Sequence, residues 1–309
     1  MKTLLICFKI LISSAVIIYL ILNYDFSKIE FNKINEVILI ISSIITLTAF
    51  LAICIRLFIL TSVKSKKLKL IDIVKINAVS NLFGVLLPSV LPDVIRVYYI
   101  KLKLNLQSSI IYVSTDRLAG LIAKILFIIV ALIFFLISEK LVEPIYIILF
   151  LTMLLYLLYF LFNLNFEIRK RIIKILSIKR FLSKERVISI FQDLDIIFRK
   201  DIFTRVMSLS LFVQLCDFMI YYVIGAFLNL GISFFQLMLI IPISTFVAAL
   251  PVSINKWTIR STLIMTGIVY FGVPENLALE LAVFKGLLEI MFSIIFGLIF
   301  ILLGTIKTK

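Results

Sequence analysis

Apolar stretches of about 20 residues recur from one end of the chain to the other, and they restrict its possible folds more than any other feature. Two examples are apolar on nearly all sides, with only Lys124 intruding: LAGLIAKILFIIVALIFFLIS (118–138) and PIYIILFLTMLLYLLYFLF (144–162). A transmembrane β-strand would instead alternate apolar and polar residues over about 10 positions. With 63% hydrophobic residues, the chain is not an ordinary soluble globule. We therefore predict an all-α fold, a polytopic membrane helical bundle that forms a single integral membrane domain over residues 1–309.

The chain has no histidine, and its three cysteines, Cys7, Cys54 and Cys216, lie in apolar stretches without a CxxC pair. Without histidine the chain cannot build a Ser-His-Asp triad, a histidine general base or a histidine-containing zinc site. We interpret the cysteines as buried apolar side chains. The sequence therefore predicts no metal centre and no cofactor.

Lysine and arginine give the chain a net charge of +15, but they gather in a few loops between apolar stretches. KSKKLK (64–69) is rich in lysine and RKRIIKILSIKRFLSKER (169–186) is rich in lysine and arginine, whereas the loops at 23–36 and 138–145 carry mixed charge. By the positive-inside rule, the two basic blocks face the cytoplasm. This pattern predicts a topology determinant rather than nucleic-acid binding, although the longer block could also contact anionic headgroups.

The apolar stretches predict about six full spans, and the first is expected to stay uncleaved because it is longer than a signal-peptide core. The predicted spans are 3–23, 37–62, 118–138, 144–163, 206–228 and 277–304. They define a first half (1–163), a basic cytoplasmic loop with interfacial helices (164–204) and a second half (205–309). The expected setting is the cell (cytoplasmic) membrane, with a multi-pass chain and both termini in the cytoplasm.

Two regions between the spans, 71–104 and 231–276, interrupt the apolar pattern with proline and charged residues. If both basic blocks are cytoplasmic, the spans at 118–138 and 144–163 leave the cytoplasm and return to it, so the first region must begin and end on the cytoplasmic side. By the same count, the second region must begin and end on the outer side. The segments LPSVLPDVIR (87–96) and LPVSINKWTIR (250–260) share Leu-Pro, a nearby serine and an arginine eight or nine residues after the proline. Re-entrant regions from opposite faces are typical of an inverted repeat, in which broken helices line a polar cavity. We predict two re-entrant helical regions of this kind.

Polar signatures in these regions are NLFGVLLPSVLPDVIRVYY (81–99), SSIIYVSTDRLAGL (108–121), LPVSINKWTIR (250–260) and FKGLLE (284–289). Together they resemble the lysylphosphatidylglycerol synthase transmembrane-region family, and the resemblance covers nearly the whole chain. Members of that family are flippase-like integral membrane proteins, found alone or fused to an aminoacyl-transferase domain. The resemblance implies a divergent stand-alone member that moves lipid between leaflets.

The first family signature reads approximately proline, Gly-Gly-Asp, then arginine, and an Asp-Arg pair follows it. The match gives Pro88, Asp93 and Arg96, with Asp116 and Arg117 as the pair. On a helix Asp93 and Arg96 share a face, so they could form an interfacial ion pair, or Arg96 could hold a lipid phosphate with its planar fork. Asp116 and Arg117 point apart, and they either cap the start of the third span or belong to the substrate site.

The second family signature reads proline, a glycine-rich turn, then Arg-Glu, and Pro251 and Arg260 match it. The resemblance makes both residues substrate-binding candidates. Neither signature keeps its glycines here, which predicts a less close approach of backbone to ligand. Leu91 and Pro92 replace the glycines of the first signature, and Asn255 and Lys256 replace those of the second, where Ser261 also stands in place of the glutamate.

Further charged residues lie inside the predicted spans. Asp217 is a carboxylate within the fifth span and so a candidate for function, unless it pairs with a loop cation. Lys285 and Glu289 are four residues apart in the last span, where they either neutralise each other or line the cavity. The cations expected to snorkel toward an interface are Lys9, Arg56 and Lys124.

Three functions fit this sequence. The first is a transporter, not an enzyme, that moves a phospholipid or a lipid-linked carrier between leaflets. The second is a membrane-embedded transferase with a lipid-phosphate donor, for which the acidic pair in DLD (193–195) is the only Asp-x-Asp. The third is a non-catalytic partner of envelope glycan or lipid enzymes. Membrane lipids are the expected partners, and nucleic acid is not.

Overall fold

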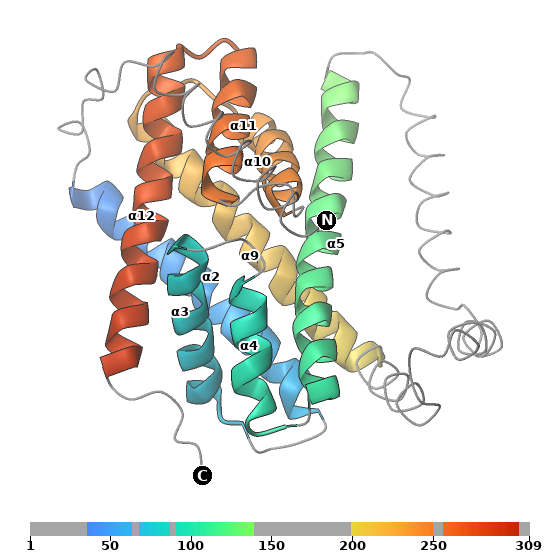
Figure 1. Ribbon diagram of the computed structural model, residues 1–309. Coiled ribbons are helices and arrows are strands. Elements are labelled where there is room, and N and C mark those ends of the chain that lie inside the picture. Colours follow the sequence, from blue (N-terminus) through green and yellow to red (C-terminus); the bar gives the residue numbers. More distant parts are fainter. Residues whose placement is uncertain are drawn as a thin grey trace, which may run out of the picture.

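The structure is a computed structural model that describes residues 36–63, 68–86, 91–104, 106–138, 199–249 and 256–302. In these segments all regular secondary structure is helical, which confirms the predicted all-α bundle (Figure 1). The helices are α2 (Glu36–Ser62), α3 (Leu70–Leu86), α4 (Leu91–Lys101), α5 (Leu106–Ser138), α9 (Lys200–Phe227), α10 (Phe234–Ala249), α11 (Lys256–Tyr270) and α12 (Glu275–Leu302).

Four stretches of the described helices are long and apolar enough to cross a membrane: Glu36–Ser62, Ser108–Phe134, Asp201–Phe227 and Glu275–Leu302. They lie in α2, α5, α9 and α12, and they match four of the predicted spans. The remaining predicted spans, 3–23 and 144–163, lie outside the described residues, as does most of the basic loop.

Helix α5 begins well before the predicted start of its span at residue 118. The polar residues ahead of that point belong to the same helix, because the bundle buries them. Ser108, Ser109 and Asp116 are all buried there, so they face protein instead of lying in a loop.

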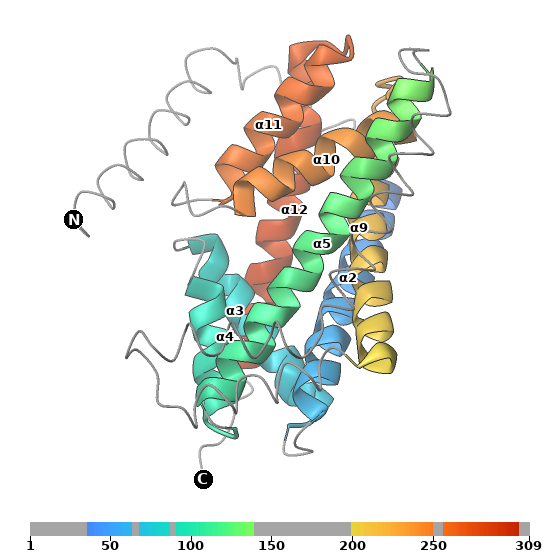
Figure 2. The ribbon, with the colours of Figure 1, turned by 90° about the vertical axis from the view of Figure 1, so that its right-hand side faces the viewer.

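The two irregular regions each form a helical hairpin. Helix α3 packs against α4, and α10 packs against α11. In Figure 2 the first hairpin rises from the lower end of the bundle and the second descends from the upper end. The helix ends that flank residues 87–90 therefore face the ends that flank residues 250–255, as two opposed re-entrant regions would.

The two halves of the chain pack in one shared pattern. Helix α4 packs on α5 as α11 packs on α12, while α3 packs on α12 as α10 packs on α5. Helices α2 and α9 lie along each other. Exchanging α2 with α9, α3 with α10, α4 with α11 and α5 with α12 therefore converts this set of contacts into itself. Because matched helices run in opposite directions (Figure 1), the arrangement is that of an inverted repeat.

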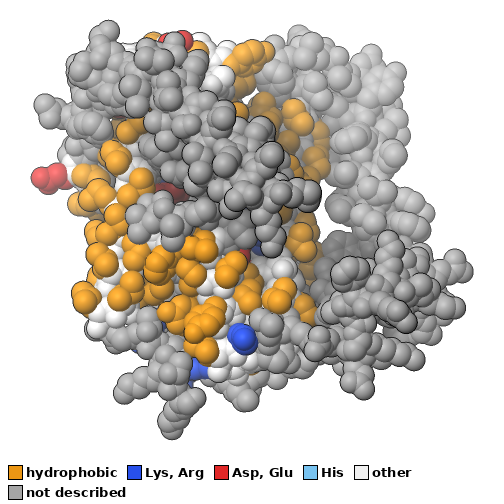
Figure 3. All heavy atoms as spheres, viewed as in Figure 1, with side chains coloured by type: hydrophobic (Ala, Val, Ile, Leu, Met, Phe, Trp, Pro, Cys, Tyr) orange, Lys and Arg blue, Asp and Glu red, His pale blue; other side chains and the backbone are white. Residues whose placement is uncertain are grey.

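Several polar side chains are buried inside the bundle among its apolar core, and apolar side chains also cover much of the outside. Asn77, Ser80 and Ser210 are fully buried, whereas Ile40 and Met291 are more than half exposed. Hydrophobic side chains cover much of the described surface in Figure 3, and lysine and arginine lie near its lower edge. A soluble protein rarely exposes so many large apolar side chains, so this surface is suited to lipid.

Each hairpin contains a glycine that lets its two helices approach closely. A Cβ atom on Gly84 of α3 would lie 2.7 Å from Cγ of Pro92 in α4. A Cβ atom on Gly267 of α11 would lie 2.8 Å from Cγ2 of Ile240 in α10. Since real Cβ atoms do not approach so closely, any larger residue would force the hairpin helices apart.

Local hydrogen bonds fix the open end of each hairpin. Lys103 Nζ donates to Asp72 Oδ2 at 2.9 Å, and the backbone N–H of Lys69 donates to the same oxygen at 3.0 Å. These bonds join the start of α3 to the chain that leaves α4. Helix α10 begins with a capping box in which Ser233 and Gln236 each accept the other's backbone N–H.

Candidate functional site

The first charge cluster consists of Arg56 from α2, Asp93 and Arg96 from α4, and Asp116 and Arg117 from α5. Arg56 Nε donates to Asp116 Oδ1 at 2.6 Å, and Arg117 Nη1 donates to Asp93 Oδ2 at the same distance. The Arg56 and Asp116 side chains are 7% and 2% exposed. Three helices therefore bring buried opposite charges together, as a low-dielectric interior requires.

Arg96 is held more loosely than its neighbours. Its Nη1 lies 3.6 Å from Asp93 Oδ1 and 3.8 Å from Asp116 Oδ2, and its Nη2 donates to Asn81 Oδ1 at 3.3 Å. Its Nε is buried and has no hydrogen-bond partner among the described residues. Both of its carboxylates are held at 2.6 Å by another arginine, so Arg96 is the cation that could most easily bind a further anion.

The second charge cluster consists of Asp217 from α9, Arg260 from α11, and Lys285 and Glu289 from α12. Lys285 Nζ lies 3.0 Å from Asp217 Oδ1 and also donates to Glu289. Arg260 meets Glu289 with both Nη1 and Nη2, which is the fork-shaped pairing of an arginine with a carboxylate. These two cations and two carboxylates balance each other.

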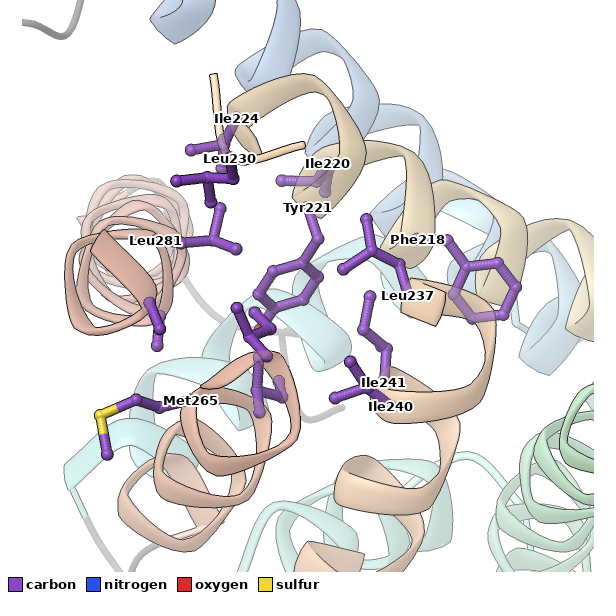
Figure 4. Close-up of a cluster of buried hydrophobic side chains, with 14 of the residues drawn as sticks. Phe218, Ile220, Tyr221, Ile224, Leu230, Leu237, Ile240, Ile241, Met265 and Leu281 are labelled. Atoms are coloured by element: carbon purple, nitrogen blue, oxygen red, sulfur yellow. The ribbon is translucent and has the colours of Figure 1, made fainter. Parts of the chain in front are cut away.

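Apolar side chains separate the second cluster from water on one side. Tyr221 of α9 lies among residues of α10, α11 and α12, including Leu237, Ile241 and Leu281 (Figure 4). The Lys285 ammonium lies 5.5 Å from the centre of the Tyr221 ring, within the range of a cation–π contact. This packing buries the Lys285 end of the cluster, while the Asp217 and Glu289 side chains stay 20% and 32% exposed.

The two clusters have the same arrangement of arginine and carboxylate. In each, an arginine on the helix that follows the break faces a carboxylate on the next long helix: Arg96 faces Asp116, and Arg260 faces Glu289. In the described segments, no group of three or more His, Cys, Asp and Glu side chains could hold a metal ion. The arrangement can instead exchange ion pairs, because each of these arginines shares its carboxylate with another cation.

Comparison with known proteins gives one family. The sequence model named Lysylphosphatidylglycerol synthase TM region matches residues 6–297. The chain belongs to this family. No curated protein and no solved structure matches it. Membership confirms the resemblance seen in the polar signatures and identifies an integral membrane protein.

The family signatures and the charges inside the spans meet in the two clusters. The first cluster contains four of the predicted site residues: Asp93, Arg96, Asp116 and Arg117. The second contains the other four that are described: Asp217, Arg260, Lys285 and Glu289. Pro88 and Pro251 lie outside the described residues. The part that any of these residues plays with substrate stays a prediction.

The predicted ion pair of Asp93 with Arg96 is present at 3.6 Å, but Arg117 of α5 lies closer to Asp93, at 2.6 Å. Asp217 pairs with Lys285 of a neighbouring span rather than with a loop cation. In both cases the partner comes from a different helix.

Arg56 is the member of the first cluster that sequence reasoning missed. It was expected to snorkel, but its side chain is buried and its Nη1 donates to Ser210 Oγ of α9 at 3.0 Å. The available signal was its position inside a 27-residue apolar helix that continues to Ser62. An arginine so placed usually faces the bundle interior.

Proposed function

We propose that the protein is a lipid transporter and not an enzyme, in which Arg96 binds the phosphate of a lipid as it passes between leaflets. The observation that carries the proposal is the loose hold on Arg96. Its two carboxylate partners lie at 3.6 and 3.8 Å, while other arginines hold the same carboxylates at 2.6 Å. Family membership supports the proposal, because the family is defined by a membrane region of this kind.

Arginine suits this role for geometric and energetic reasons. Its planar fork donates two parallel hydrogen bonds to a phosphate, which a lysine cannot do. An arginine at the bilayer centre costs about 2.5–3.5 kcal/mol on insertion scales, so it needs partners or water. A lipid phosphate would supply the partner that Arg96 Nε lacks among the described residues.

Arg260 is the corresponding cation of the second half. Here Glu289 pairs with both Nη atoms, whereas Arg96 makes only loose contacts, and Nε lacks a hydrogen-bond partner among the described residues in both arginines. We propose that the two arginines take the phosphate from opposite sides of the membrane, as related halves of an inverted repeat would.

We also propose that the transporter acts in the cell membrane with both basic blocks and both termini in the cytoplasm. Its partners are then membrane lipids, and the moving lipid is a phospholipid or a lipid-linked carrier. Co-purification with an envelope glycan or lipid enzyme, together with no transport by the purified protein, would favour a non-catalytic partner instead.

The test is transport by purified protein in vesicles that contain an acyl-labelled fluorescent phosphatidylglycerol. Dithionite added outside bleaches only the label in the outer leaflet, so the rate of further bleaching reports transport. We expect the rate to fall from wild type through Arg96→Lys to Arg96→Gln. The Gln variant should lose about 10- to 100-fold, since a hydrogen bond to a charged group contributes about 1.5–3 kcal/mol.

The matched control is Arg199→Gln. The Arg199 side chain is 66% exposed and lies 3.7 Å from an exposed Asp201, so its loss should leave transport and folding unchanged. Yield and thermal unfolding in detergent are measured for every variant. Transport by correctly folded Arg96→Gln at the wild-type rate would contradict the phosphate-binding role.

A further inference from the structure

Arg96 and Arg260 each face a carboxylate, and in each cluster a second cation also binds that carboxylate. Asp116 contacts Arg96 at 3.8 Å, but its other oxygen accepts from Arg56 Nε at 2.6 Å. Glu289 pairs with Arg260 and also with Lys285. The second cation comes from α2 in the first cluster and from α12 in the second. Both halves therefore pair one carboxylate with two cations, although the second cation lies on a different helix in each.

We propose that Arg56 and Lys285 are positioning residues that hold these carboxylates while the neighbouring arginine leaves to bind a lipid phosphate. The inference rests on the proposed function and assigns a role to residues that do not touch the lipid. With Arg56 in place, Arg96 can turn toward a phosphate without leaving Asp116 as an unpaired buried charge. Such a charge is strongly unfavourable in a protein interior.

Hydrogen bonds to two neighbouring helices hold the Arg56 side chain in place. Its Nη1 donates to Ser210 Oγ at 3.0 Å, and Ser210 Oγ donates in turn to the backbone carbonyl of Val206 at 2.8 Å. Gly120 of α5 lies beside the guanidinium, so a Cβ atom added there would be 3.6 Å from Nη1, at ordinary contact distance. Arg56 is therefore fixed among α2, α5 and α9, while Arg96 has no contact shorter than 3.3 Å among those described above.

Lys285 is fixed in a similar way. Its side chain is 2% exposed and lies between Asp217, Glu289 and the Tyr221 ring. When Arg260 leaves, Lys285 can still pair with Glu289. The carboxylate therefore keeps a cation in either state.

Removal of Arg56 should have a specific effect on transport. Without it, Arg96 becomes the remaining cation near Asp116 and is drawn to that carboxylate, so less of it is available for phosphate. Removal of the Asp116 charge as well should release Arg96 again. A role in packing alone predicts no such rescue, because the double variant lacks the same contacts between α2, α5 and α9.

The experiment uses full-length protein in vesicles with increasing content of the labelled phosphatidylglycerol. Four variants are compared with wild type: Arg56→Gln, Arg56→Lys, Asp116→Asn and the double variant Arg56→Gln/Asp116→Asn. The readouts are the lipid content at half-maximal rate and the maximal rate. Thermal unfolding and vesicle insertion are recorded for each variant, and only variants that match wild type in both are interpreted.

We expect Arg56→Gln to raise the half-saturating lipid content about tenfold, which converts to about 1.4 kcal/mol, with a smaller change in maximal rate. Arg56→Lys should lie between wild type and Arg56→Gln, because it keeps the charge but not both contacts to Asp116 and Ser210. The double variant should return to within about threefold of wild type. No change in Arg56→Gln, or a double variant as impaired as Arg56→Gln, would overturn the role of Arg56. Wild-type transport by Arg96→Gln, or no transport by the wild-type protein, would instead overturn the proposed function.

Discussion

Gly297 lies where α12 packs closely on α3 of the other half, and its replacement by alanine tests this packing. A Cβ atom at this position of α12 would lie 2.5 Å from Leu82 Cβ of α3 and 3.0 Å from Leu82 Cδ2. The nearest atom is next to the Leu82 backbone, so rotation of the leucine side chain cannot relieve the contact. The helices would have to move apart, and overpacking of this kind costs about 1–3 kcal/mol.

The expected loss is a balance of two effects. Alanine gains about 1 kcal/mol over glycine inside a helix, and a contact this short lies at the upper end of the overpacking range. Gly297→Ala should therefore lower the free energy of unfolding by about 2 kcal/mol. The matched control is Gly225→Ala in α9, whose Cβ would meet only Leu230 Cδ1 at 3.8 Å, so this change should be neutral or slightly stabilising.

The assay is equilibrium unfolding in detergent, followed by circular dichroism. Leu82→Ala should not rescue Gly297→Ala, because the clashing Cβ remains. The reasoning would be refuted if Gly297→Ala proved as stable as Gly225→Ala.

Three further predictions address topology, metal dependence and pH. In a cysteine-free background, single cysteines at Lys184 and at Lys140 should be labelled from opposite sides of the membrane, and labelling from the same side would contradict the topology. Metal chelators should leave transport unchanged, since no histidine is available; a loss restored by added metal would favour the transferase. Asp72 lies outside the candidate spans. Burial alone raises the pKa of its carboxyl, but hydrogen bonds from Lys103 and from the Lys69 N–H outweigh burial and lower that pKa. Its stabilising effect should therefore be complete above about pH 4 and vanish as pH falls through the lowered value. Asp72→Asn should destabilise the protein at neutral pH but not in strong acid, and an equal loss at both would contradict this.

The sequence was sufficient to predict the two opposed hairpins. With both basic blocks predicted on the cytoplasmic side, residues 71–104 and 231–276 could fit the predicted number of membrane crossings only by entering and returning. In the structure α3 packs on α4 and α10 packs on α11, which gives the two hairpins that this argument predicts. Lys285 and Glu289 were predictable as a pair because i,i+4 neighbours share a helix face.

The pairing within the first cluster could not be predicted from the sequence. Arg56 and Asp116 are 60 residues apart in the chain, and Asp93 and Arg117 are 24 apart, so no local spacing relates them. Their partners are set by which helices pack together, and apolar helix surfaces say little about that choice. Arg56 was misread as a snorkelling residue, although its place inside a long apolar helix favoured the bundle interior.

The most direct test of the central claim is a structure of the protein in a membrane that contains an anionic phospholipid, determined by electron cryomicroscopy. The account predicts phosphate density within hydrogen-bond distance of Arg96, about 2.7–3.0 Å from its guanidinium, with Arg56 still bound to Asp116. Lipid density confined to the apolar outer surface, with Arg96 drawn fully onto Asp93 and Asp116, would contradict it.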